Sequence, residues 1–242
     1  MLRLRNLVQV ACMATVALTV FSCSQDELEI VKGKGNTIIA ATFEGAGGNT
    51  RTTVNDQYQI VWQETDALAL FCTDNSKTTL TYAGGAGTTS ATFTGNKESG
   101  KTASFSVYPD QMDMSVTNNT LTMTLPATLE NYAGTSNGPM YAKVTDADNL
   151  NALSFKHMAA LIKLTVNKIP ADATTFKITA SNNIAGTCTA DLNVEYPVLT
   201  IKDEGTNKTI TATFDASSGI TSRSFYIPLP VGTYQFITAE LT

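Results

Sequence analysis

The feature of this sequence that most constrains its fold is a long succession of short runs rich in threonine, valine, isoleucine and aromatic residues, separated by glycine, asparagine and aspartate. Such runs are typical of β-strands, and the clusters between them are typical of turns. We predict strands at 37–43, 58–62, 67–72, 79–82, 91–94, 103–108, 121–125, 140–144, 159–166, 174–179, 187–192, 198–201, 209–214, 223–227 and 232–241. Many short strands with turns between them favour an all-β fold of antiparallel sandwiches over an α/β fold.

Local patterns refine this interpretation. In 209–214 threonine alternates with apolar residues, which suits a strand with one buried and one exposed face. Residues 154–160 are the one stretch that we expect to form a helical turn or two. The glycine-rich segment 84–87 is predicted to be a hairpin loop, because no helix follows it to bind phosphate.

The pattern of strands breaks near 167–173, where we place a domain boundary. We predict an N-terminal β-sandwich domain at 37–166 and a C-terminal β-sandwich domain at 167–242. The second domain is short for a sandwich and stops at Thr242 within a strand-like run, so we expect it to be truncated. The alternative is that the last strand ends there.

The N-terminus has the parts of a bacterial lipoprotein signal. Two arginines precede an apolar stretch at 7–21, which is shorter than the roughly twenty residues that a membrane-spanning helix needs. The stretch ends in Val-Phe-Ser before Cys23, as in a lipobox, and a cysteine thiolate is the nucleophile that would take the lipid. We predict a cleaved signal peptide at 1–22, lipid on Cys23 and a tether at 23–36. An ordinary secretory signal with a chance cysteine is the alternative.

These features predict an exported protein that is held at the bacterial outer membrane. Several acyl chains should hold a folded domain firmly, whereas one chain binds only marginally. The 242-residue chain has a net charge of −5 and only 15% charged residues, which argues against a nucleic-acid partner. No second long apolar run is present in the sequence.

Two cysteines, Cys72 and Cys188, follow Cys23 in the chain. Both lie in strand-like runs, where a small buried thiol is the common role of cysteine. We expect two buried free cysteines; a disulfide, which export would permit, is the alternative.

Catalytic residues are scarce. His157 is the only histidine and lies in a predicted structural turn, so neither a catalytic triad nor a zinc site is expected. The acidic segment 146–151 resembles the start of a calcium loop, but Asn151 and His157 stand where that loop needs glycine and glutamate. Trp62 is expected to pack in the core or at its rim. We predict no enzyme, no cofactor and no metal.

Four landmarks occur in order along the chain. They are Thr-Arg-Thr-Thr at 50–53, a tryptophan strand with an acidic turn and an aliphatic strand at 61–71, Val-Tyr-Pro at 107–109 with Leu-Pro at 125–126, and Leu-Ser-Phe-Lys-His-Met-Ala-Ala-Leu at 153–161. Together with the lipobox, this order resembles the fimbrillin-like pilin family of Bacteroidales. The resemblance covers most of the chain after the signal.

The resemblance implies two stacked β-sandwich domains of transthyretin-like type and assembly into surface fimbriae. It makes Arg51 the candidate proteolytic processing site and 37–43 the strand that is lost and replaced by a strand of another subunit. Such strand addition uses main-chain hydrogen bonds and side-chain pockets. An ordinary loop arginine, shared by relatives that are not cut, is the alternative. Family chains usually continue well past the position of Thr242. If the C-terminal region is truly absent, we expect the chain to accept a donor strand without giving one, as a terminal or anchoring subunit would.

We therefore expect a structural fimbrial subunit or fimbria-associated lipoprotein that supports adhesion. Its expected partners are other fimbrial subunits through strand addition, the outer membrane through the lipid anchor, and a host or bacterial surface ligand. The expected location is the cell surface, lipid-anchored in the outer membrane, and the fimbrium after processing. The alternative is a surface lipoprotein that binds glycans or other ligands; an envelope enzyme is the least favoured class.

Overall fold

The computed structural model describes residues 37–43, 53–54, 60–130, 138–147, 150, 153–202, 207–215 and 221–242. They belong to one compact unit, Lys32–Thr242. Every helix or strand assigned within these ranges is a β-strand, which confirms the all-β prediction. None of these ranges contains a helix that is long and apolar enough to cross a membrane.

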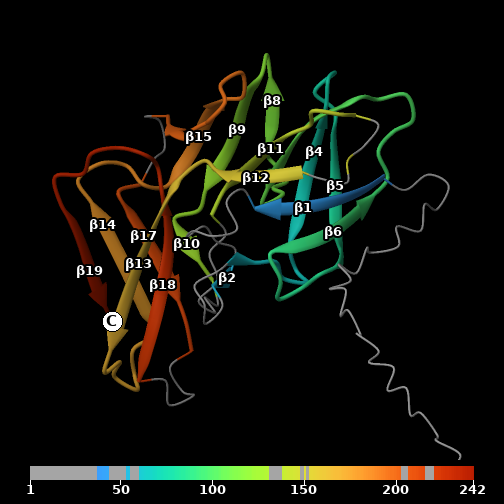
Figure 1. The fold of residues 1–242 in the computed structure, drawn as a ribbon. Helices are drawn as coiled ribbons and strands as arrows, with labels where there is room; N and C mark the ends of the chain where they lie inside the picture. Colours follow the sequence, from blue (N-terminus) through green and yellow to red (C-terminus); the bar gives the residue numbers. More distant parts are fainter. Residues whose placement is uncertain are drawn as a thin grey trace, which may run out of the picture. The chain divides into compact units, whose positions relative to one another are not determined.

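The strands follow one another along the chain as shown in Figure 1. They are β1 (Thr37–Phe43), β2 (Thr53–Val54), β3 (Ile60–Val61), β4 (Ala67–Cys72), β5 (Lys77–Gly84), β6 (Ser90–Gly95), β7 (Ala103–Tyr108), β8 (Ser115–Thr117), β9 (Thr120–Leu125), β10 (Thr128–Leu129), β11 (Met140–Lys143), β12 (Leu153–His157), β13 (Ala160–Asn167), β14 (Thr175–Ala180), β15 (Gly186–Asp191), β16 (Thr200–Ile201), β17 (Thr209–Thr213), β18 (Ser222–Leu229) and β19 (Ile237–Leu241).

Seven strands close into a barrel in the order β1-β12-β11-β7-β4-β5-β6. Neighbouring strands are antiparallel except β1 and β12, which run parallel. Alternate residues point inward, so that Leu68 and Leu70 of β4 lie in the barrel core with Phe93 and Phe155. A barrel of about this size has an interior that side chains can fill completely.

A second core lies on the other side of β4 and β7. Ala69 and Phe71 of β4 pack there with Val107, Met123 and Cys188. The last two residues come from the sheet β16-β15-β9-β8. Strand β4 is therefore apolar without a break because both of its faces are covered.

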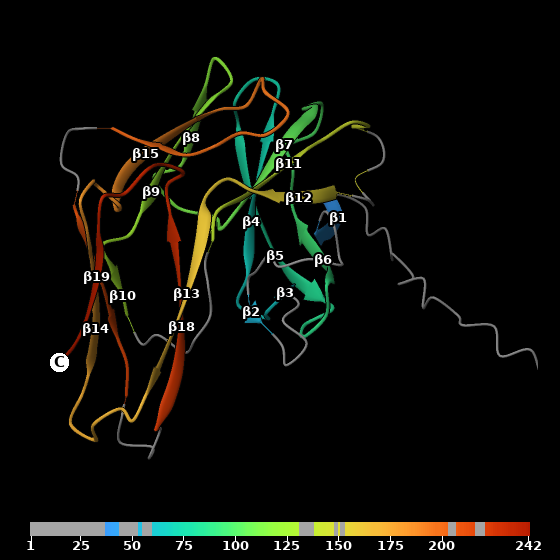
Figure 2. The same ribbon diagram turned by 60° about the vertical axis from the view of Figure 1, so that its left-hand side comes forward.

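A third core lies between the sheet β10-β17-β14-β19 and the strand pair β13–β18, which Figure 2 shows from the side. Phe225 of β18 is its centre. It stacks on Phe176 with ring centroids 4.0 Å apart and meets Phe214 edge-on at 5.5 Å. Ile210, Ala212 and Phe214 are buried, which confirms the alternation predicted for 209–214.

Strand pairing crosses the predicted domain boundary between 166 and 167. Strand β15 pairs with β9, and β10 pairs with β17, so each half of the chain adds strands to sheets of the other. Strand β13, which precedes the boundary, packs on the third core. The division at that boundary and the two transthyretin-like sandwiches stay predictions.

The helical turn predicted over 154–160 is wrong. Residues Leu153–His157 form β12, and β13 begins at Ala160. Leu153 and Phe155 point into the barrel core, whereas Ser154 is exposed and Lys156 half-buried. This period of two, together with pairing to β1 and β11, outweighs the local preference of a segment only a few residues long.

Most of the remaining strands overlap the predicted ranges, but the strand predicted at 232–241 begins only at Ile237. Strands β1, β4 and β7 begin and end at the predicted residues, and 84–87 lies in the hairpin between β5 and β6. The sequence did not indicate β2, β8 or β10, because each has only two or three residues. A run that short shows no periodicity.

Candidate functional site

Strand β1 closes the barrel and is the element on which the candidate site is built. Figure 1 shows it between β6 and β12. It pairs antiparallel with β6 from Thr37, opposite Gly95, to Thr42, opposite Ser90. Its pairing with β12 is parallel and shorter, and runs from Ala41 to Phe43. One edge of β1 is thus bonded along most of the strand and the other only near its end.

The inward side chains of β1 are apolar and buried. Ile39 and Ala41 have no exposed surface, and Phe43 is 6% exposed, whereas the residues between them are half-buried. Phe43 stacks on Trp62 with ring centroids 4.6 Å apart and planes inclined by 17°. Because side chains alternate along 37–43, three apolar side chains of β1 lie in the barrel core. They fill the part of the core between β6 and β12.

The ring of Trp62 lies against the inward side chains of β1, and we call this ring the floor beneath β1. Besides the Phe43 ring, its ring meets Phe93 edge-on at 5.0 Å and Tyr108 and Phe155 edge-on at 5.6 Å each. It is fully buried, which confirms the packing role predicted for it. Its Nε1 is buried and has no hydrogen-bond partner in the described part of the chain. Aromatic pairs of this kind add stability beyond the area that they bury.

A buried pair of polar groups holds the loop that follows Trp62. Tyr108 Oη donates to Asp66 Oδ1 at 2.8 Å, and the backbone N–H of Gln63 donates to Asp66 Oδ2 at the same distance. Burial raises the pKa of the Asp66 carboxyl above its ordinary value, although both hydrogen bonds oppose this. Burial also raises the pKa of Tyr108 well above that of an ordinary phenol.

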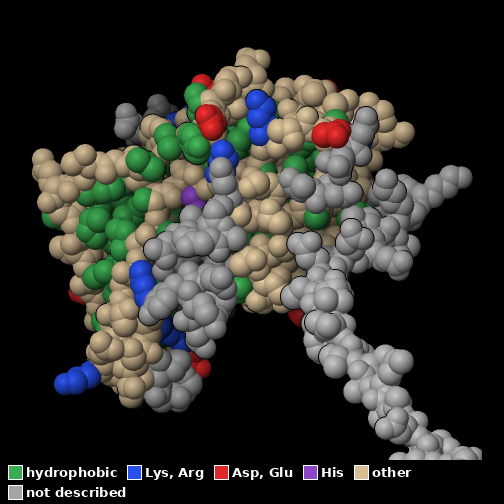
Figure 3. All heavy atoms as spheres, viewed as in Figure 1, with side chains coloured by type: hydrophobic (Ala, Val, Ile, Leu, Met, Phe, Trp, Pro, Cys, Tyr) green, Lys and Arg blue, Asp and Glu red, His purple; other side chains and the backbone are tan. Residues whose placement is uncertain are grey.

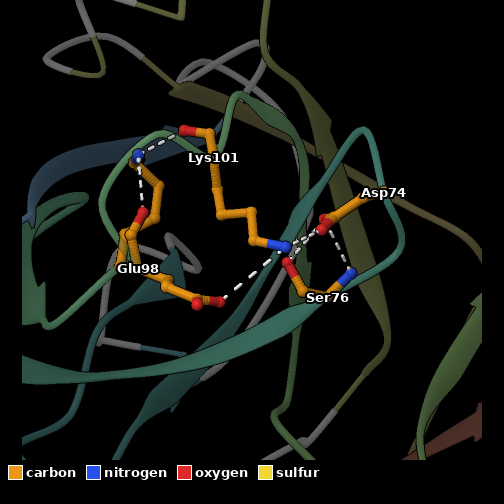
Figure 4. Close-up of polar contacts among 5 residues, drawn as sticks. Asp74, Ser76, Glu98 and Lys101 are labelled. Carbon is orange, nitrogen blue, oxygen red and sulfur yellow. Dashed lines mark hydrogen bonds and ion pairs between the residues drawn. The ribbon is translucent and has the colours of Figure 1, made fainter.

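An exposed polar cluster lies in the turns at the ends of β4 and β6 (Figure 4). Lys101 forms ion pairs with Asp74 and, at 3.8 Å, with Glu98. Ser76 Oγ donates to Asp74 Oδ1 at 2.6 Å. The hydrogen bond from Lys101 holds the pKa of Asp74 well below its usual range. The cluster joins the β4–β5 turn to the segment that follows β6, the neighbour of β1.

Cys23 and Arg51 both lie outside the described residues, so lipidation and processing stay predictions. Cys72 and Cys188 are both buried and free, which confirms the prediction for them. Burial raises the pKa of Cys188 to about 11. His157 is half-buried at the end of β12.

No protein-family model and no curated protein matches the chain significantly. Among solved structures, the chain is similar to a crystal structure from Bacteroides ovatus described as a "putative cell adhesion protein", with 12% sequence identity and a TM-score of 0.48. The similarity covers 85% of this chain and 82% of that chain. A likeness at this level assigns neither a family nor a function.

The arrangement around β1 suits non-covalent exchange of a strand. Without β1, the strands β6 and β12 would become free edges, and the ring of Trp62 would lose its stacked partner. An incoming strand with apolar residues at every second position could pair with both edges and refill the core. The sequence indicated β1 and Trp62 separately, but not that Phe43 stacks on Trp62.

Proposed function

We propose that this protein is a structural subunit of cell-surface fimbriae that assembles by exchange of β1 and supports adhesion. The observation that carries the proposal is that one strand near the start of the described chain closes the barrel and places three apolar side chains in its core. A cut at Arg51, downstream of β1, would leave the strand attached only through main-chain hydrogen bonds and packing.

The energetics of β1 suit a strand that stays in place until it is replaced. Burying a side chain such as Ile39 or Phe43 contributes about 1.5–3 kcal/mol each, so the barrel would be strongly destabilised without the strand. Two free edges beside an exposed aromatic floor would also invite uncontrolled pairing. A donor strand from a second subunit would bury apolar side chains in the core again and would pair with the two free edges.

The finer parts of the proposal rest on the sequence. They are membership of the fimbrillin-like pilin family, two transthyretin-like sandwiches, export with lipid on Cys23, and an outer-membrane location that changes to the fimbrium after processing. If Arg51 is not cut, the lipid stays and the protein acts as an anchoring subunit. No catalytic step is part of this function.

An arginine-specific protease tests the proposal on the chain without its first 23 residues. Only two arginines, Arg51 and Arg223, then remain in the sequence. Arg223 lies in β18, where Val166 of β13 pairs with it, so we expect cleavage at Arg51 alone. The cut protein should form a ladder of multimers on a gel.

Matched variants control this experiment. Arg51→Lys should stay intact and monomeric, whereas Arg223→Lys should behave like the parent protein. If the parent is cut at Arg51, loses β1 under mild denaturation and still remains monomeric, strand exchange between copies is not its function.

A further inference from the structure

A cavity of about 520 Å³ lies against the outer face of β11 and β12, away from the barrel core. Tyr141 pairs with Lys156 in the register of these strands, so the alternate residues Lys143 and Ser154 lie on the same outer face. The opposite wall is the turn after β15, which contributes Asn193 and Glu195. A cavity of this volume is within the range of small-molecule sites and could hold one or two sugar rings.

The lining of the cavity combines two cations with one carboxylate, Glu195, and neutral hydrogen-bonding groups. Lys143 and Lys156 supply the positive charge, and Thr145, Ser154 and Asn193 supply hydroxyl and amide groups. Figure 3 shows basic side chains above β12 on the face in view, with acidic side chains beside them. The whole chain has a net charge of −5, so this positive lining is a local feature and not part of a general basic surface.

One of the two cations is held in place by an aromatic ring. Lys156 Nζ lies 4.3 Å from the ring centroid of Tyr196, which is 63% exposed. A cation–π contact of this kind restricts the lysine side chain and so lowers the entropy lost when a ligand binds. Tyr141 Oη, which also lines the cavity, donates a long hydrogen bond of 3.5 Å to the carbonyl oxygen of Leu192, just before the turn.

From this lining we infer that the cavity binds a carboxylated sugar of the hexuronic or sialic acid class. The two ammonium groups would pair with the carboxylate, while the hydroxyl and amide groups and the Glu195 carboxylate would bond the sugar hydroxyls. A free phosphate would fill little of the volume. Among the described residues, the lining also contains no arginine, whose planar guanidinium matches phosphate best.

Calorimetry on the Arg51→Lys protein tests the inference, because this variant lacks the proposed cleavage site and binding is then measured independently of assembly. The probes are glucuronic acid and N-acetylneuraminic acid, with glucose as the neutral counterpart of glucuronic acid and inorganic phosphate as a simple anion. We expect saturable binding of at least one acid, and binding of glucose and phosphate weaker by about tenfold or more.

Charge-removing variants assign the binding to this cavity. Lys143→Met and Lys156→Met should each weaken binding of the acid about tenfold. Lys177→Met, on β14 and outside this cavity, should leave binding unchanged. Thermal unfolding of each variant verifies that it is folded. Equal binding of glucose, equal binding of phosphate, no binding of either acid, or unchanged binding in both lysine variants would overturn the assignment.

Discussion

The core around Trp62 and the core around Phe225 are both aromatic, but strands enclose them to different degrees. In the barrel, Trp62 and Ile39 have no exposed surface. At the third core, Ile162, Leu164 and Val166 of β13 are only partly buried. Ile237 of β19, which is not a member of that core, is 37% exposed. Strands β13 and β19 are the outermost members of their sheets among the described strands.

The difference between the two cores indicates what β1 contributes to the barrel. A closed barrel has no edge strand, whereas each open sheet ends in a row of unpaired main-chain groups. Removing β1 would give the barrel two free edges, as the sheets around the third core have, and would also uncover the ring of Trp62. The centre of the third core, by contrast, stays buried although its sheets are open, since Phe225 has no exposed surface.

The largest expected effect comes from removing the ring that β1 places on Trp62. Phe43→Ala removes the ring stacked on Trp62 and should lower the free energy of unfolding by about 3–5 kcal/mol. Ile237→Ala, in the open region, should cost less than about 1 kcal/mol because its side chain is already partly in water. Urea unfolding of both variants measures the contrast. Equal losses would mean that the enclosed position in the barrel contributes no more to stability than the exposed position on β19.

Proline at matched strand positions tests the role of the two edges. Ala41 pairs with Ala91 on one side and with Leu153 on the other, whereas Ala239 pairs only with Ile178. Ala41→Pro should lower the free energy of unfolding by about 2 kcal/mol, because a donor of the ladder is lost within the closed barrel.

Ala239→Pro should cost about half as much or less, since proline is tolerated in edge strands. The measurement is again the unfolding midpoint in urea. A larger loss at Ala239 would show that β19 is not an edge in solution.

A smaller, pH-dependent effect is expected at Asp66 in the barrel. Its pKa is raised in the folded protein, so the folded state binds the proton more tightly than the unfolded state does. Its contribution to stability is therefore fully present below the ordinary carboxyl pKa and is lost as the pH rises through the raised value. The stability difference between the wild type and Asp66→Asn should shrink over that window. A difference that grows with pH would contradict the assigned burial.

Replacing Asp74 should have the smallest effect on stability, and this effect should depend on pH in the opposite direction to that of Asp66. Its pKa is lowered by Lys101, so its contribution is present above the ordinary carboxyl pKa and is lost as the pH falls through the lowered value. The pair is exposed, so salt should weaken it. In low salt, the free energy of unfolding of the wild type should rise relative to that of Asp74→Asn between acid and neutral pH. In 1 M salt, most of this rise should disappear. A rise that salt does not change would exclude a screened ion pair.

Much of the fold could be predicted from the sequence, because alternation along a strand is a local signal. Strand β1 was predicted to the residue, and the free thiols of Cys72 and Cys188 followed from their strand-like surroundings. Strand β12 was not predicted, because its alternation spans only five residues and is too short to be separated from a helical turn. Its pairing with β1 and β11 decides its conformation.

The sites divide in the same way. The lipobox at Cys23 and the loop arginine Arg51 can be recognised from the sequence and stay predictions, since they lie outside the described residues. The cavity lined by Lys143 and Lys156 could not be predicted, because its second wall comes from the turn after β15.

The sequence by itself determined that this chain is all-β, where most of its strands lie and which residues face inward, because side-chain alternation and turn residues act locally. Only the tertiary structure decided that β1 closes a barrel and that Phe43 of this strand stacks on Trp62 in the barrel core. It also decided that Tyr108 donates a hydrogen bond to Asp66. These contacts join segments far apart in the chain, and their geometry depends on the register and order of the strands, which composition and spacing do not specify.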